Sequence, residues 1–173
     1  MSPSPGFRHQ NLASELTYQL RRFFKGKSCT AIAAPFDVKL SDFDVVQPDL
    51  LVVCDPKQIK DTHIEGGPTL VVEILSESST VRDRHDKMRL YAKHGVKEYW
   101  IVTPFPPLVE VYVLAGDVYR LPRSYTLGET LESPSFPELT ISMDDLFDFE
   151  FTEEEKKIFE VNERRPPYRS EKS

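Results

Sequence analysis

A carboxylate interrupts one of the most apolar stretches of the chain. Glu73 lies within the run Val-Val-Glu-Ile-Leu at residues 71–75. One explanation is a strand with one face in water, although Glu73 would then share that face with Val71 and Leu75. The other explanation is a charge held in a partly buried site by a cation, because an unpaired buried carboxylate is costly.

Asp49 is a second candidate because it opens the preceding apolar run, residues 50–54. If both runs are strands that fold back symmetrically about the centre of their loop, residue 49 falls opposite residue 74. Antiparallel neighbours lie about 5 Å apart, so Asp49 and Glu73 can converge. Converging carboxylates repel each other unless a cation or proton intervenes, and oxygen ligands with room for water suit Mg²⁺ or Mn²⁺. The alternative for Asp49, which follows a proline, is a helix cap or turn role.

The helix that follows Glu73 supplies a cation. Asp83, Lys87 and Tyr91 recur at every fourth position, so they lie in one narrow sector of a helix. Lys87 borders the core face, and a long lysine stem covers apolar surface while it delivers its ammonium to a buried edge. The alternative is an Asp83–Lys87 ion pair on a solvated face, which stabilises a helix by only a few tenths of a kcal/mol.

Periodicity indicates the elements that must position these side chains. Leu12, Leu16 and Leu20 predict a helix over residues 9–25, which Gly26 ends. Short β-branched runs predict strands. The elements expected after the first helix are an extended segment 29–40, strands 50–54 and 70–75 joined as a hairpin with a long loop, a helix between Thr80 and Gly95, a strand 99–103, a hairpin of 108–114 with 118–121, and a helical turn 142–147.

The character of the chain changes beyond Glu150. Thr152 and Glu155 fit a capping box, which predicts a short helix over residues 153–161. Residues 164–173 hold adjacent prolines and almost no apolar side chains, so we expect them to be disordered. The sequence therefore predicts one domain over residues 1–149 and an appendage over residues 150–173.

Length and composition favour a single folded domain. The chain has 173 residues, of which 39% are hydrophobic and 29% charged, and its net charge is −6. This charge argues against a wholly basic coat for nucleic acid, but not against a local basic surface around an acidic site. No apolar run approaches the about 18 residues of a membrane span, and residues 1–6 lack the core of a secretion signal. Cys29 and Cys54 lack a CxxC spacing, so we expect two reduced thiols in the core of a cytoplasmic protein, with one disulfide as the alternative.

Taken together, these residues resemble the PD-(D/E)XK nuclease superfamily, and more closely its bacterial "putative restriction endonuclease" branch. The pattern of that branch is P-D, then E-x-x-S, then D-x-x-x-K-x-x-x-Y, then G-V-x-E-Y-W. Here it reads Pro48-Asp49, Glu73-Ile74-Leu75-Ser76, Asp83 with Lys87 and Tyr91, and Gly95-Val96-Lys97-Glu98-Tyr99-Trp100. The ordered series covers roughly residues 1–147.

The resemblance implies an α/β fold with a mixed sheet in the restriction-endonuclease-like order α-β-β-β-α-β, to which the second hairpin adds a C-terminal extension. It also implies Mg²⁺-dependent hydrolysis of phosphodiester bonds of DNA, with Mn²⁺ as a substitute. Asp49, Glu73 and Lys87 would be catalytic, and Asp49, Glu73 and the backbone carbonyl of Ile74 would hold the metal. Asp83 and Tyr91 would be supporting residues, with Asp83 positioning Lys87 and Tyr91 making a hydrogen bond near the same place. A homodimer fits this chemistry because cutting both strands needs two sites.

Two features depart from the superfamily pattern. The superfamily's motif lysine would fall at Leu75, whereas the branch resembled here carries its lysine on the following helix, at Lys87. Members of the branch also have a further segment before residues 1–5, so we expect one sheet edge, and an acidic residue on it, to be missing. The alternative function is a non-catalytic, nuclease-like module for binding or interaction.

Several other residues are expected to be structural. Tyr99 and Trp100 lie in an apolar strand, which favours core packing over stacking on bases. His85 and His94 have no ligand-spaced partner. His9 matches a histidine of the branch, but its place at the start of a helix favours a surface role.

Overall fold

A mixed seven-stranded sheet forms the centre of the molecule. The computed structural model describes residues 6–76 and 81–163, without the side chains of residues 81–83 and 159–163. The sheet has the order β1-β4-β6-β7-β8-β10, with β9 paired to β8. Only β6 and β7 pair in parallel among these described strands. The strands are β1 Thr30–Ala33, β4 Leu50–Val53, β6 Leu70–Ile74, β7 Glu98–Thr103, β8 Leu108–Ala115, β9 Val118–Tyr119 and β10 Arg123–Tyr125.

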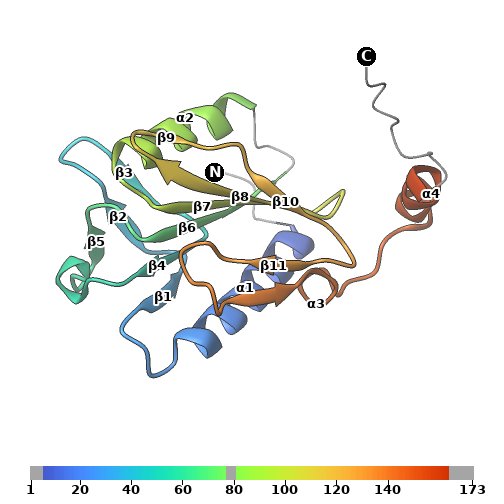
Figure 1. Cartoon of the computed structure of the whole chain (residues 1–173), viewed down its shortest axis with the longest axis horizontal. Helices are drawn as coiled ribbons and strands as arrows, with labels where there is room; N and C mark the ends of the chain where they lie inside the picture. Colours follow the sequence, from blue (N-terminus) through green and yellow to red (C-terminus); the bar gives the residue numbers. More distant parts are fainter. Residues whose placement is uncertain (1–5, 77–80, 164–173) are drawn as a thin grey trace, which may run out of the picture.

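Helices cover both faces of this sheet, with α2 above it and α1 below it in Figure 1. α1 buries Leu12 and Leu16 against the face that carries Val72, whereas α2 buries Tyr91 against the face that carries Val71. Because successive strand residues point to opposite faces, Glu73 lies on the α2 face with Val71. The helices are α1 Phe7–Phe24, the 3-10 helix η1 Pro56–Gln58, α2 Val81–Lys93, α3 Met143–Leu146 and α4 Glu153–Glu163.

Two smaller sheets flank the central one. A three-stranded sheet has the order β3-β2-β5, and a two-stranded sheet pairs β11 with β12. The predicted extended segment 29–40 is therefore two strands in different sheets. The small strands are β2 Asp37–Lys39, β3 Val45–Val46, β5 His63–Glu65, β11 Thr130–Glu132 and β12 Thr140–Ser142. Of the helices that the structure describes, none is long and apolar enough to cross a lipid bilayer.

The expected mixed α/β fold is confirmed. Without the small strands, the chain runs α1, β1, β4, β6, α2 and β7, and the β8–β9 hairpin follows. The capping box is also present, because the backbone N–H of Thr152 donates to Glu155 at 2.8 Å and that of Glu155 donates to Oγ1 of Thr152 at 3.3 Å. The tail that was predicted to be disordered, residues 164–173, lies outside the described residues.

The β4–β6 register differs by one residue from the expected pairing. Leu50 lies opposite Val72, so the ladder extended by one residue brings Asp49 opposite Glu73 rather than opposite residue 74. The expectation assumed a symmetric loop. The loop is asymmetric because it contains η1 and then β5, which leaves the central sheet to pair with β2. The true register places the two carboxylates directly across from each other.

Gly67 sets how closely the entry to β6 approaches the end of α2. A Cβ atom at this position would lie 2.2 Å from the carbonyl oxygen of His94, so only glycine fits between the two segments. Nε2 of His94 in turn lies 3.0 Å from Oδ2 of Asp44, which ties this end of α2 to the β2–β3 turn. These contacts hold α2 over β6, and hence over Glu73.

Glu98 is a fully buried carboxylate with a structural role. It accepts hydrogen bonds from Nε1 of Trp100 at 2.6 Å, from Oγ of Ser133 at 2.9 Å and from the backbone N–H of Ser135 at 2.8 Å. Donors on two segments thus compensate the cost of burying the charge. The Glu-Tyr-Trp part of the family pattern anchors the β11–β12 connection, and Trp100 is in the core as expected.

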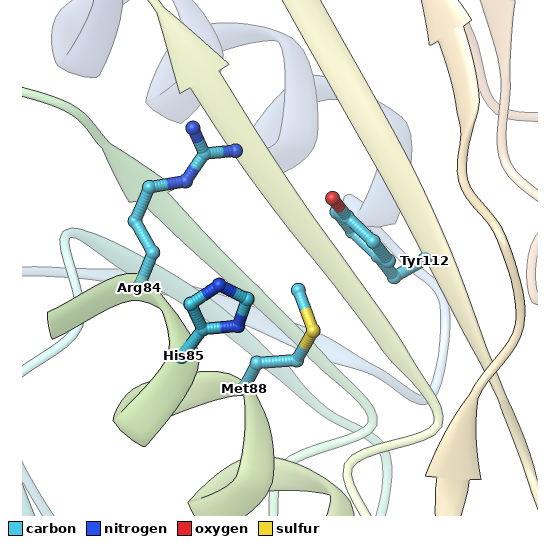
Figure 2. A pocket seen from close by; sticks show the side chains of 4 residues that line it. All are labelled: Arg84, His85, Met88 and Tyr112. Atoms are coloured by element: carbon cyan, nitrogen blue, oxygen red, sulfur yellow. The ribbon is translucent and has the colours of Figure 1, made fainter. Parts of the chain in front are cut away.

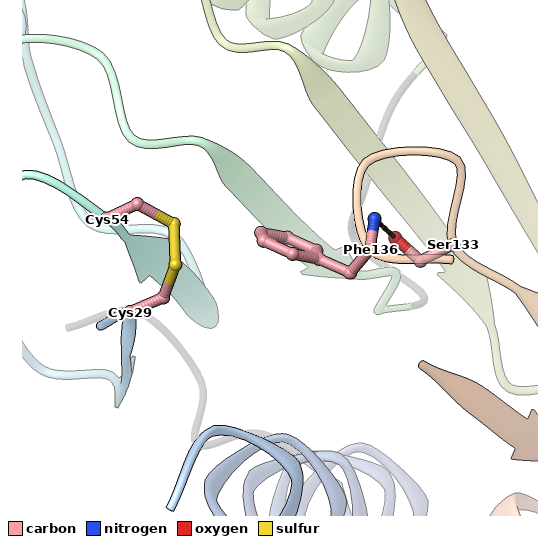
Figure 3. The surroundings of a disulfide bond; sticks show 4 residues. All are labelled: Cys29, Cys54, Ser133 and Phe136. Atoms are coloured by element: carbon pink, nitrogen blue, oxygen red, sulfur yellow. Dashed lines mark hydrogen bonds between the residues drawn. A yellow bond between two sulfur atoms is a disulfide. The ribbon is translucent and has the colours of Figure 1, made fainter. Parts of the chain in front are cut away.

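The expectation of two reduced thiols is wrong, because Cys29 and Cys54 form a disulfide. Thr30 pairs with Val53 across β1 and β4, so the next residues outward, the two cysteines, face each other with 4.0 Å between their Cα atoms. In Figure 3 the ring of Phe136 points toward this bond. The disulfide therefore removes the argument for a cytoplasmic location that was based on reduced thiols.

We predict that the unreduced protein contains no free thiol and that reduction destabilises it. The bond joins residues 25 positions apart, and closing a loop of this size stabilises a protein by about 3 kcal/mol. Thiol titration in denaturant, with urea unfolding before and after reduction, measures both effects. In the double variant Cys29→Ala/Cys54→Ala, reductant should change nothing. Two titratable thiols in the unreduced protein would refute the disulfide.

Candidate functional site

Asp49 and Glu73 meet where β4 begins and β6 ends. Oδ2 of Asp49 accepts a hydrogen bond of 2.7 Å from the backbone N–H of Ile74, so the aspartate bridges from β4 to β6. Glu73 is 7% exposed, and it is one of few charged residues buried in the described part of the chain. Burial is the main cause that raises the pKa of Glu73, and the charge of Asp49 adds a smaller rise. The structure thus brings together the two acidic residues that the sequence singled out.

Lys87 and Tyr91 reach Glu73 from α2. Nζ of Lys87 lies 2.7 Å from Oε2 of Glu73, and the hydroxyl of Tyr91 donates to Oε1 at 2.7 Å. Residues four apart lie one turn apart on a helix, so one helix face delivers both groups. This is the sector that the spacing of Asp83, Lys87 and Tyr91 predicted. The side chain of Asp83 lies outside the described residues, as does any contact between it and Lys87.

Burial and partners oppose each other at Glu73. Burial raises the pKa of this carboxyl, because a charge is poorly solvated inside the protein, whereas the Lys87 ammonium and the Tyr91 hydroxyl lower it. The net direction is upward. Burial and the nearby Glu73 charge also raise the pKa of Tyr91 far above its ordinary value, so the phenol remains a hydrogen-bond donor. Lys87 and Tyr91 therefore offset part of the effect of burial on Glu73.

His9 belongs to this cluster, and its expected role as a surface residue is wrong. Nε2 of His9 lies 3.3 Å from Oδ1 of Asp49, and the imidazole side chain is only 12% exposed. The Asp49 hydrogen bond raises the pKa of His9 against the effect of burial, and the Asp49 charge and the Ile74 backbone add to the rise. Nδ1 is buried without a hydrogen-bond partner among the described groups. The match to the branch histidine was the one sequence signal for this contact.

The oxygen atoms at this point fit a hard divalent cation. Asp49 and Glu73 supply two carboxylates, and the backbone of Ile74 lies next to Asp49, to which its N–H donates, and next to His9. Within residues 6–76 and 81–163, no three His, Cys, Asp or Glu side chains form a ready metal cluster. An ion here would therefore rely on two carboxylates, one carbonyl and water. Mg²⁺ characteristically binds through one or two carboxylates and keeps several waters.

Comparison with known proteins gives a family model and two similar chains. The model described as "Uma2: Putative restriction endonuclease" matches residues 1–144. The uncharacterized protein slr1290 of Synechocystis sp. is 36% identical over 89 residues, which are 51% of this chain and 47% of that protein. The matched stretch thus spans about half the length of this curated relative.

A solved structure has a similar fold. It is the crystal structure of a putative nuclease belonging to DUF820 from Anabaena variabilis, with a TM-score of 0.70 and 22% sequence identity. The match covers 84% of this chain and 83% of the other. At this level of identity the comparison supports the fold and not the activity.

The Lys87–Glu73 pair predicts a pH-dependent loss of stability in Lys87→Met. The substitution leaves the buried carboxylate without its cation, which we expect to cost about 1 kcal/mol, since Lys87 is partly exposed. When the pKa of a carboxyl is raised in the folded state, the free energy of unfolding of the protein falls as the pH rises through that pKa. Removing Lys87 raises the pKa of Glu73 further, so Lys87→Met should destabilise the protein more at pH 8 than at pH 5. Urea unfolding in chelator at both pH values measures it.

Lys93→Met is the matched control on the same helix. Lys93 is 68% exposed and lies 3.4 Å from Asp44, so its removal should change the free energy of unfolding little at either pH. Equal losses in the two variants would mean that Lys87 does not support the charge of Glu73.

Proposed function

The chain belongs to the Uma2 family of putative restriction endonucleases, and we propose that it hydrolyses phosphodiester bonds of DNA with the help of a divalent cation. The observation that carries this proposal is the contact of Lys87 with Glu73, beside which Asp49 is held by the register of β4 and β6 and by the N–H of Ile74. Two carboxylates with an adjacent ammonium suit the hydrolysis of a phosphodiester, which needs a metal ion and a stabiliser of developing negative charge.

Asp49, Glu73 and the carbonyl of Ile74 would hold Mg²⁺, or Mn²⁺ in its place. When bound, the ion would supply polarisation of a phosphoryl oxygen and a lowered pKa for a bound water. The protein's part is to fix the ligands. The N–H of Ile74 and the imidazole of His9 orient the two oxygens of Asp49, and Tyr91 orients one oxygen of Glu73.

Lys87 would act on the reacting groups. Its ammonium lies against Glu73 while its side chain is 43% exposed, so it contacts the proposed metal ligand and remains accessible from solvent. There it would orient the attacking water or offset charge on the pentavalent transition state. Leu75, at the commoner lysine position of the superfamily, is partly buried and packs against the hydrophobic cluster under α2. A helix-borne lysine is thus the arrangement that this chain supports.

One observation favours the alternative of a non-catalytic binding module. The carboxylate oxygens of Asp49 and Glu73 already have protein partners. A module that had lost catalysis could keep these contacts as structural ones. Metal binding and cleavage assays on variants separate the two functions.

Cleavage of both strands would require two sites, so a homodimer is part of the proposal for duplex DNA. We propose that the protein acts in the cytoplasm, where the DNA of its bacterial relatives lies. Sedimentation of the protein with and without a DNA duplex would test the dimer.

We predict that Asp49→Asn and Glu73→Gln each abolish Mn²⁺ binding and cleavage. Each change removes one negative ligand but keeps the volume and hydrogen-bonding shape of the side chain, so the fold should persist. Calorimetric titration with Mn²⁺ and cleavage of a labelled duplex and a labelled single strand provide the two readouts. The assignment of the metal ligands fails if either variant binds Mn²⁺ as tightly as the wild type does.

We predict that Lys87→Met retains Mn²⁺ binding but lowers turnover about 100-fold or more, the scale for loss of one electrostatic stabiliser. Leu75→Lys in this background moves the ammonium to the commoner position and should restore part of the activity. Lys93→Met should cleave like the wild type. Unchanged turnover in Lys87→Met would exclude Lys87 from catalysis, and no cleavage by the wild type on any of these substrates would favour the binding module.

A further inference from the structure

A hollow opens beside the candidate site, between α2 and β8. Figure 2 shows its lining, with Arg84, His85 and Met88 on α2 and Tyr112 facing them from β8. Its volume is about 230 Å³, which is below the roughly 300 to 1,000 Å³ of pockets for whole drug-sized ligands. The space therefore suits one flat ring rather than a larger molecule.

The hollow is connected to Glu73 by a row of paired residues across the sheet. Glu73 pairs with Ile101 on β7, and Ile101 pairs with Glu110 on β8. Paired residues on neighbouring strands face the same side, so Glu110 lies on the α2 face like Glu73. Two strand spacings separate the two glutamates, about 10 Å. A nucleotide advances about 3.4 Å in a stacked duplex strand and further in an extended single strand, so the hollow lies within about three nucleotides of the candidate site.

Glu110 holds a cation at the rim of this hollow. Oε2 of Glu110 accepts a hydrogen bond from Arg84, and Oε1 accepts one of 3.0 Å from the hydroxyl of Tyr112. Arg84 lies one helical turn before Lys87, and its side chain is 33% exposed. A guanidinium has five N–H donors in a planar fork, and one carboxylate oxygen does not use them all. Arg84 can therefore donate to a phosphate while Glu110 keeps it in place.

The walls of the hollow suit an aromatic ring. His85 is exposed on α2, Met88 is half-buried beside it, and the buried ring of Tyr112 forms the floor. Histidine is among the side chains on which unpaired bases stack, and a thioether makes favourable contacts with aromatic rings. A base within a duplex is stacked and paired, so only an unpaired base could enter.

We propose that this hollow binds the base of an unpaired nucleotide near the scissile phosphate, with Arg84 on its phosphate and His85 against its ring. The inference rests on the proposed function and deepens it. It makes single-stranded or frayed DNA, rather than continuous duplex, the substrate class of this site.

The test is the binding of a labelled single strand of about twelve thymidines to the Glu73→Gln protein, which should not cut it. We expect His85→Ala to weaken binding about tenfold, the scale for one stacked base, and His85→Phe to retain it. Arg84→Met should also weaken binding and should lower the slope of log K against log salt by about 1, as loss of a phosphate contact does. Duplex binding should not respond to His85→Ala.

Arg89→Met is the matched control, since Arg89 is an exposed cation of the same helix. It should affect single strand and duplex alike and only weakly. Arg84→Met leaves the Glu110 carboxylate without its cation, which could unfold the protein. In that case the double variant Arg84→Met/Glu110→Gln, which also removes the Glu110 charge, is used in the binding test instead. In an otherwise wild-type protein, His85→Ala should raise KM for the single strand and leave kcat within about twofold, because it removes binding rather than chemistry.

The outcomes separate the two proposals. A wild-type protein that binds neither strand nor duplex overturns the proposed function, and the subsite with it. A wild-type protein that binds or cleaves DNA, while His85→Ala and Arg84→Met match Arg89→Met, overturns the subsite alone. Equal weakening of duplex and single strand by His85→Ala would also overturn it.

Discussion

The burial of one negative charge organises this molecule. Glu73 is 7% exposed in a strand whose neighbours are all apolar, and such a charge is stable only with partners. Its partners come from elements that are separate in the chain, with Lys87 and Tyr91 on α2 and Asp49 opposite on β4. Gly67 allows α2 to end close against the entry to β6. The contacts that stabilise the buried Glu73 carboxylate are therefore the same contacts that assemble the candidate site.

Local periodicity accounts for the part of this arrangement that the sequence predicted. A helix repeats every 3.6 residues whatever it packs on, so the spacing of Lys87 and Tyr91 predicted that both face one direction. The apolar residues beside them on the same helix predicted that this direction borders the core. The β4–β6 register is less local, because it depends on how η1 and β5 use the residues of the loop. The one-residue error there came from treating a structured connection as a symmetric one.

Contacts between segments distant in the chain could not be predicted in this way. His9 lies 40 positions before Asp49, and only the packing of α1 brings it to Asp49. The disulfide depends on the β1–β4 register, which no periodicity reveals. The Arg84–Glu110 pair could be predicted only if the order of β6, β7 and β8 in the sheet were known. In each case the residue type was visible in the sequence, but its partner was set by sheet topology.

The same topology explains how an acidic chain could bind a polyanion. The net charge is −6, but charges beyond a Debye length of about 8 to 10 Å are largely screened at the surface, so a phosphate responds to the nearest groups. On the α2 face, Lys87 forms an ion pair with Glu73 and Arg84 forms one with Glu110, while His9 contacts Asp49. The net charge of these paired residues is therefore close to zero. Two added positive charges between Asp49 and Glu73 would make it attractive to phosphate, so we expect divalent cation binding and DNA binding to reinforce each other at this site.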